Sequence, residues 1–199
     1  MKTFCTVCCA LLLSLQGCLY SGGQHPSLDR LPDRISQQPG VNQYQGASVG
    51  IIEFSGPDNA REIGRLAAEL LYQKLLPFNV YSRLELIPQS RLVSPGEGYL
   101  DLARSKQLDL LITGDVGYFL EGGNFQASRV CESVQAVEAI GTRVETVWQA
   151  SSCEEAEYTE SKDLIFYRTR GKASASALEL MKELAGQFAA MLLTVPPLH

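Results

Sequence analysis

The sequence predicts a single α/β domain, in which a mixed sheet with helices packed on it follows the order β-α-β-α-β-β-β-α. Three observations predict this class. Short β-branched runs alternate with helical periods early in the body, two alternating segments flank a glycine turn, and an amphipathic segment comes last. Because helical crossovers make strands parallel and hairpins make them antiparallel, this order predicts a mixed sheet.

The first half of the body predicts three parallel strands with two helices between them. Strands are expected over 47–54, 80–87 and 108–120, and a short helix over 99–106. The first helix ends before Pro77. Its inward stripe recurs at spacings of three and four and comprises Ile63, Leu66, Ala67, Leu70, Leu71 and Leu75.

Residues 130–153 predict a hairpin around Gly141, Thr142 and Arg143. One face becomes apolar when Ile140 pairs with Val144. That register also places Ala136 opposite Trp148, Gln135 opposite Gln149, and Cys131 opposite Cys153 on the more polar face. A shift by one residue would separate the two thiols onto different faces, so we reject it.

The remainder of the body is predicted from charge and periodicity. The acidic segment 154–162 is expected to be a loop, and its sequence does not indicate a role. Residues 164–168 are expected to form a short edge strand. A last helix over 174–193 should cover the sheet beside the first helix, and residues 195–199 form a tail.

The N-terminus indicates export and a lipid anchor. Lys2 and the apolar stretch 7–15 are typical of a signal peptide, because the stretch is too short to cross a membrane. Its ending, Leu15-Gln16-Gly17-Cys18, resembles the lipobox of bacterial lipoproteins, which implies acylation of Cys18. The alternative is a soluble exported protein cut elsewhere. We expect a signal peptide over 1–17, a lipidated cysteine and flexible tether over 18–46, and the domain over 47–194.

Composition excludes some classes of partner. Loss of residues 1–17 leaves 16 Lys and Arg against 22 Asp and Glu, a formal charge of −6. Without a basic stripe, nucleic acid is not an expected partner. Beyond the signal, no window has the ~18 consecutive apolar residues of a membrane helix. Attachment to a membrane would therefore depend on the lipid.

Cysteine usage predicts a disulfide in the exported body. Only Cys131 and Cys153 remain there once the signal cysteines and Cys18 are set aside. Two thiols in an oxidising compartment favour a disulfide, and free thiols are the alternative. A metal site is not expected, because the only histidines, His25 and His199, stand near the two ends of the chain.

Catalytic patterns are weak, so we expect neither enzymatic activity nor a cofactor. Neither histidine lies inside the body to act as a general base. The pair Glu154 and Glu155 is more typical of a solvated surface than of a glycosidase. The glycines at 96–98 and 114–117 lack the spacing of a phosphate-binding loop and are more typical of turns and strand bends.

Aromatic residues supply the candidate binding groups. Trp148, the only tryptophan, faces the core in the register above, although a binding anchor is the alternative. Tyr118, Phe119 and Phe125 lie near the turn at residues 122–124. They are candidate partner contacts, and loop packing is the alternative reading.

Three segments carry a family resemblance, namely 49–54, 103–116 and the Gly141-Thr142 hairpin that leads to Trp148. Together they resemble the fold shared by the N-terminal domain of TolB and the lipoproteins CsgG, LpoB, FlgO and PelC. The resemblance covers residues 47–193. These segments are structural, so they predict a fold better than an activity.

The resemblance implies a non-enzymatic lipoprotein on the periplasmic side of the outer membrane. Leu19 after the acylated cysteine implies outer-membrane sorting by analogy, because it is not the Asp that favours inner-membrane retention. The expected role is a scaffold for an envelope protein complex, flagellar or export-related, with a homo-oligomeric ring as one form. The alternative is an LpoB-like module that activates a peptidoglycan synthase.

Overall fold

The computed structural model describes residues 34–37, 44–58, 60–89, 97–123, 126–157, 162–164, 167–169 and 173–193. In chain order its elements are β1 (Arg34–Gln37), β2 (Ser48–Ile52), α2 (Arg61–Leu75), the 3₁₀ turn η2 (Leu76–Phe78), β3 (Arg83–Ile87), α3 (Glu97–Lys106), β4 (Leu110–Leu120), β5 (Arg129–Ile140), β6 (Arg143–Glu155), β7 (Lys162–Leu164), β8 (Tyr167–Thr169) and α4 (Ala177–Leu193). The predicted α/β class is confirmed.

A six-stranded mixed sheet in the order β1-β6-β5-β4-β2-β3 forms the centre of the protein. Strand β2 pairs in parallel with both β3 and β4, as expected from the helical crossovers. The remaining neighbours, β4 to β5, β5 to β6 and β6 to β1, are antiparallel. The short strand β2 is buried along nearly its whole length, because it lies inside the sheet with helices over its faces.

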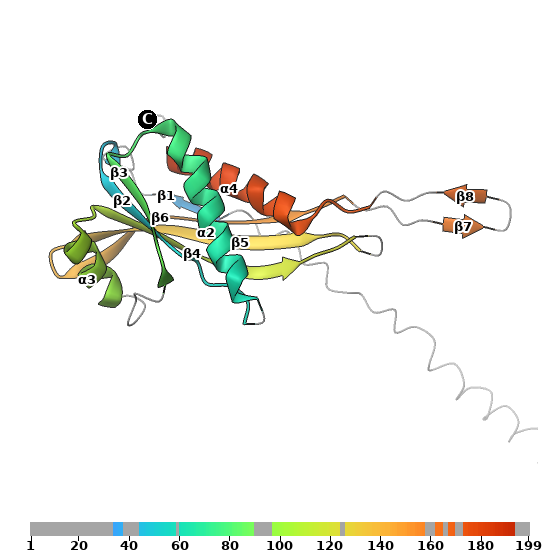
Figure 1. Ribbon diagram of the computed structural model, residues 1–199, viewed down its shortest axis with the longest axis horizontal. Coiled ribbons are helices and arrows are strands. Elements are labelled where there is room, and N and C mark those ends of the chain that lie inside the picture. The colour runs from blue at the N-terminus through green and yellow to red at the C-terminus, as the bar shows by residue number, and fades with distance from the viewer. Residues whose placement is uncertain are drawn as a thin grey trace, which may run out of the picture.

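Helices α2 and α4 lie together on one face of the sheet, and α3 packs on the other face near one end (Figure 1). The apolar stripe of α4 turns Met181, Leu184 and Phe188 into the core. A capping box starts α4 at Ala177, three residues later than expected. Ser176 Oγ accepts from the Glu179 N–H at 3.2 Å, and Glu179 Oε2 accepts from the Ser176 N–H at 3.1 Å.

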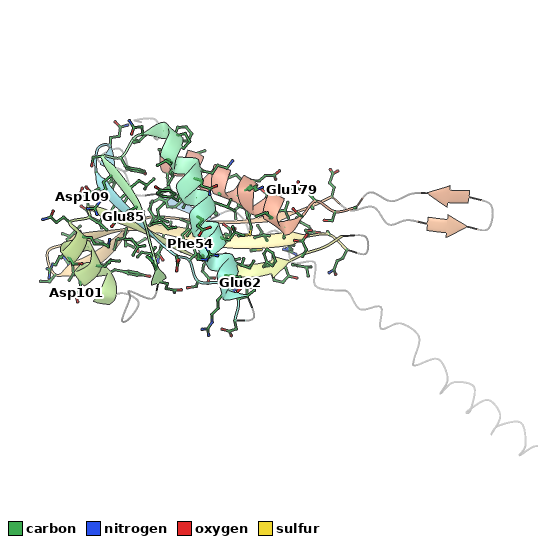
Figure 2. All side chains as sticks on the ribbon, viewed as in Figure 1. Phe54, Glu62, Glu85, Asp101, Asp109 and Glu179 are labelled. Atoms are coloured by element: carbon green, nitrogen blue, oxygen red, sulfur yellow. A yellow bond between two sulfur atoms is a disulfide. The ribbon has the colours of Figure 1, made fainter. Side chains whose placement is uncertain are left out.

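Helix α2 approaches the end of β2 so closely that a glycine is required at the contact. A Cβ atom on Gly64 would lie 2.2 Å from the carbonyl oxygen of Phe54. Phe54 is buried between α2 and the sheet (Figure 2). A Cβ atom on Gly114 would lie 2.9 Å from the Phe54 ring. Gly64, Gly114 and the Phe54 ring together therefore set the distance between α2 and the sheet.

Two interpretations of the sequence are corrected by the fold. The tether was expected to lack structure throughout 18–46, but its residues Arg34–Gln37 form β1 and pair with β6, and Tyr44 is buried. The segment expected as one edge strand over 164–168 instead forms two strands, β7 and β8, which pair with each other outside the main sheet. A hairpin satisfies its own backbone hydrogen bonds without needing the edge of another sheet.

Substitution of Gly64 by Ala should destabilise the protein. The added methyl would collide with backbone atoms, so overpacking at ~1–3 kcal/mol or more should exceed the ~1 kcal/mol that Ala gains in a helix. Gly186→Ala in α4 is the matched control, because nothing lies within 4 Å of its added Cβ, and it should stabilise slightly. Urea unfolding measures both, and equal stabilisation by the two would contradict this packing.

Candidate interaction surface

The β5–β6 hairpin has the predicted register over most of its length. Cys131 lies opposite Cys153, Gln135 opposite Gln149, and Ala136 opposite Trp148. Trp148 is 1% exposed and belongs to the core, as the register predicted. Its Nε1 has no hydrogen-bond partner among the described residues.

The tip of the hairpin differs from the prediction. Val147 is an extra residue on β6, so Ile140 pairs with Arg143 and not with Val144, and the turn is the dipeptide Gly141-Thr142. Gly141 has φ +58, the left-handed conformation that two-residue hairpin turns require. The bulge lets Val147 as well as Trp148 contact the main core.

The sheet presents one uncovered polar surface, which we call the open face. It comprises the side chains of β4, β5 and β6 that alternate away from α2 and α4. These are Asp115, Tyr118, Cys131, Ser133, Gln135, Gln149, Ser151 and Cys153. The buried Thr113 continues the same face beside Tyr99 of α3. Among the described helices, only α3 packs on this side of the sheet.

A disulfide joins Cys131 to Cys153 across β5 and β6 on the open face, with their Cα atoms 4.1 Å apart. The directly opposed register brings the two residues together. A hollow of about 170 Å³ lies beside the disulfide, and Asp115 and Ser133 contribute to its wall. Both residues also line a second hollow of about 220 Å³ that reaches Tyr99 of α3. The open face is therefore hollowed from the disulfide to α3.

A bulge in β4 separates the predicted aromatic contacts. Gly117 has no partner on β5, so Tyr118 pairs with Cys131 and Phe119 pairs with Val130. Tyr118 is thereby turned to the open face, where it is 40% exposed, while Phe119 packs against the core. The structure does not bring the two rings to one surface, and Phe125 lies outside the described residues, as does Cys18.

Arg129 supports the exposed ring of Tyr118. Its guanidinium carbon lies 5.9 Å from the ring centroid, within the range of a cation–π contact. The same guanidinium lies 3.7 Å from Glu155 Oε2, at the end of β6. The acidic pair at 154–155 was expected to begin a loop, but both residues belong to β6. One end of the open face therefore carries an aromatic ring with a charged pair beside it.

Glu132 is a buried carboxyl group that sequence analysis did not identify. It is 4% exposed on the face that α4 covers, and its Oε1 has no hydrogen-bond partner among the described residues. Burial raises the pKa of Glu132 to about 8, because the charged form loses its hydration. The alternation of β5 could have indicated it, since Glu132 falls in the inward series with Val130 and Val134.

Two exposed apolar side chains stand away from the open face. Leu76 and Phe78 in η2 are 53% and 59% exposed. They follow α2 and flank Pro77, which ends that helix as expected. The Leu-Pro-Phe triplet was the sequence signal for these two apolar side chains. Apolar residues directly after a helix are equally consistent with packing against the core, so the triplet alone did not predict their exposure.

The described residues offer a surface for binding and no evident catalytic constellation. Within them, no group of three or more His, Cys, Asp or Glu could hold a metal ion. No helix in the part of the chain that the structure describes is long and apolar enough to span a membrane. The polar open face, with Asp115 near its middle, is suited to contact with another polar surface.

Comparison with solved structures finds the same fold in PelC from Paraburkholderia phytofirmans, which forms a dodecamer. The TM-score is 0.57 with 14% sequence identity, over 80% of this chain and 96% of that one. A dodecameric variant of that PelC gives a TM-score of 0.56 with 13% identity, over 81% and 98%. Lipoprotein GNA1162 from Neisseria meningitidis gives only 0.40 with 14% identity, over 73% and 97%. No protein-family model and no curated protein matches the chain.

Stability should fall as pH rises because of Glu132. Its folded pKa lies above the ordinary value of 4.5, so its protonated form favours folding, and that contribution is lost between about pH 4.5 and pH 8. Glu132→Gln stays neutral and should be more stable than the parent at pH 8 by a few kcal/mol, but not at pH 4. Urea unfolding across this range measures it, with the exposed Glu155→Gln as control. Parallel curves for parent and Glu132→Gln would contradict the burial.

The disulfide should be recovered from the folded protein. A protease digest without reductant, analysed by mass spectrometry, should contain a peptide that joins Cys131 to Cys153. Because the bond closes a loop of about 20 residues, Cys153→Ser should lower the free energy of unfolding by ~2–4 kcal/mol under oxidising conditions. Complete alkylation of both thiols in the unreduced protein would instead identify them as free.

Proposed function

We propose that this protein is a non-enzymatic scaffold of a bacterial envelope assembly, built from several copies of the chain. The observation that carries the proposal is the fold shared with dodecameric PelC, which extends over nearly the whole of that protein. The open face, where a disulfide joins Cys131 to Cys153, offers a polar surface for contacts with other proteins.

The location belongs to the same proposal. The sequence Leu15-Gln16-Gly17-Cys18 supports acylation of Cys18, and a lipid on that residue would hold the body on the periplasmic side of the outer membrane. Fifteen residues separate Cys18 from Arg34, which begins β1. Sixteen Cα–Cα steps at ~3.3–3.6 Å each reach at most about 53–58 Å, which limits the distance between β1 and the headgroups.

Self-assembly is tested on the full-length protein extracted in detergent. Size-exclusion chromatography with light scattering should give a mass of several copies, because a scaffold of this kind requires contacts between copies. A strict monomer at high concentration would contradict the proposal. Affinity purification from solubilised envelope then identifies the assembly served. Recovery of a peptidoglycan synthase alone would favour the activator role.

Lipid attachment is tested separately by growth with labelled palmitate. The full chain should incorporate the label, and Cys18→Ala should not, since the acylated thiol is gone. Cys9→Ala, a change of the same kind inside the expected signal, is the matched control and should remain labelled. Equal labelling of parent and Cys18→Ala would exclude this residue as the anchor.

A further inference from the structure

The two edges of the main sheet differ in how they resist further strand pairing. On β3, Glu85 pairs with Arg83 at 2.9 Å and with Lys106 at 2.9 Å, so charges lie along that edge. At the opposite side the outermost strand is β1. The stretch of β6 that β1 covers, Trp148 to Ser151, carries no charged residue, whereas Arg143, Glu145, Glu154 and Glu155 lie elsewhere on β6. Charged edges discourage added strands, whereas neutral edges accept them. This stretch of β6 is therefore able to accept a strand.

Within one chain, strand β1 pairs with this stretch of β6. Among the described elements, this pairing is what joins β1 to the main sheet. It pairs with β6 through four residue positions, from Arg34 opposite Ser151 to Gln37 opposite Trp148. Among the described elements, β6 is its only neighbour in the sheet. Four pairs make a small contact, so β1 can leave one β6 edge and occupy an identical one with little change in interaction energy.

The segment between β1 and β2 is long enough for β1 to pair with β6 of its own chain or with β6 of an adjacent copy. Strand β1 lies four positions from β2 in the sheet, about 19 Å at ~4.8 Å per strand. Eleven Cα–Cα steps separate Gln37 from Ser48, which starts β2, and these reach up to about 36 Å at ~3.3 Å each. A β6 edge on an adjacent copy within that radius is therefore within reach of β1, as is the chain's own edge.

The symmetry of such an exchange suits a ring. The donor, β1, and the acceptor, the outer edge of β6, are different surfaces of the protein. Contacts between different surfaces join copies head to tail, and such contacts close into rings when the rotation allows. We propose that, in the assembled protein, β1 of each copy pairs with β6 of the next copy in the register seen here. This inference rests on the self-assembly in the proposed function.

The test uses two full-length variants produced together in one cell. Ser36 lies directly opposite Gln149, so one copy carries Ser36→Cys and the other carries Gln149→Cys. Mild oxidation in the envelope should give a covalent dimer on a non-reducing gel, because each copy has only half of the engineered pair. Ser36→Cys with Glu145→Cys is the matched control, since Glu145 is exposed on β6 but lies outside the β1 register, and it should give no dimer.

The double variant Ser36→Cys with Gln149→Cys in one chain completes the test. Exchange predicts a ladder of covalent oligomers, whereas pairing within the chain gives a cross-linked monomer and no mixed dimer. That second result, or the absence of any cross-link, would overturn the inference. Light scattering on the same variants separates the two proposals. An oligomer without mixed dimers contradicts exchange alone, whereas a monomer contradicts self-assembly as well.

Discussion

Backbone N–H and C=O groups along the outer edge of β6 need partners, and β1 supplies them from outside the predicted domain. This pairing links the N-terminal segment to the sheet, so an anchor at the N-terminus would be coupled to the position of the sheet. Without β1, the sheet would end in β6, whose uncharged stretch from Trp148 to Ser151 carries Trp148 on its buried side. A strand that precedes the predicted domain in sequence is therefore part of the fold.

The two faces of the sheet differ in polarity because β-bulges in β4 and β6 interrupt the alternation of side chains along these strands. Along β4, the unpaired Gly117 reverses the sides of the following residues, so Tyr118 reaches the open face and Phe119 the core. In β6, Val147 has a similar effect beside the hairpin tip. These bulges keep the face under α2 and α4 apolar and leave the open face polar. Two polar side chains that lie opposite each other, Glu132 and Ser152, are nevertheless buried on the apolar side.

The periodicity of the sequence predicted those features of the fold that depend on residues close together in the chain. The helix that ends before Pro77, the parallel strands and the Cys131–Cys153 register follow from local spacing and from the need for one apolar face. The β1 strand could not be predicted in this way. Its four residues, Arg-Ile-Ser-Gln, have no sustained alternation, and their partner lies more than 100 residues away along the chain.

Bulges explain the remaining differences between prediction and structure. A strand bend was predicted for the glycines at 114–117, but local spacing did not show that Gly117 is unpaired, and nothing in the sequence pattern pointed to Val147. The grouping of Tyr118 with Phe119 as contacts assumed that neighbours in sequence share a surface, which strand geometry does not allow. The acylation of Cys18 stays a prediction, because that residue lies outside the described part of the chain.

Hydrogen–deuterium exchange on the intact protein tests most directly whether β1 closes the sheet. Ile35 lies opposite Ala150, and Ile35→Pro removes a backbone donor from β1. If β1 protects this edge, peptides covering residues 148–151 should exchange slowly in the parent and faster in the variant, while β4 peptides stay unchanged. Identical exchange of residues 148–151 in both proteins would contradict the account.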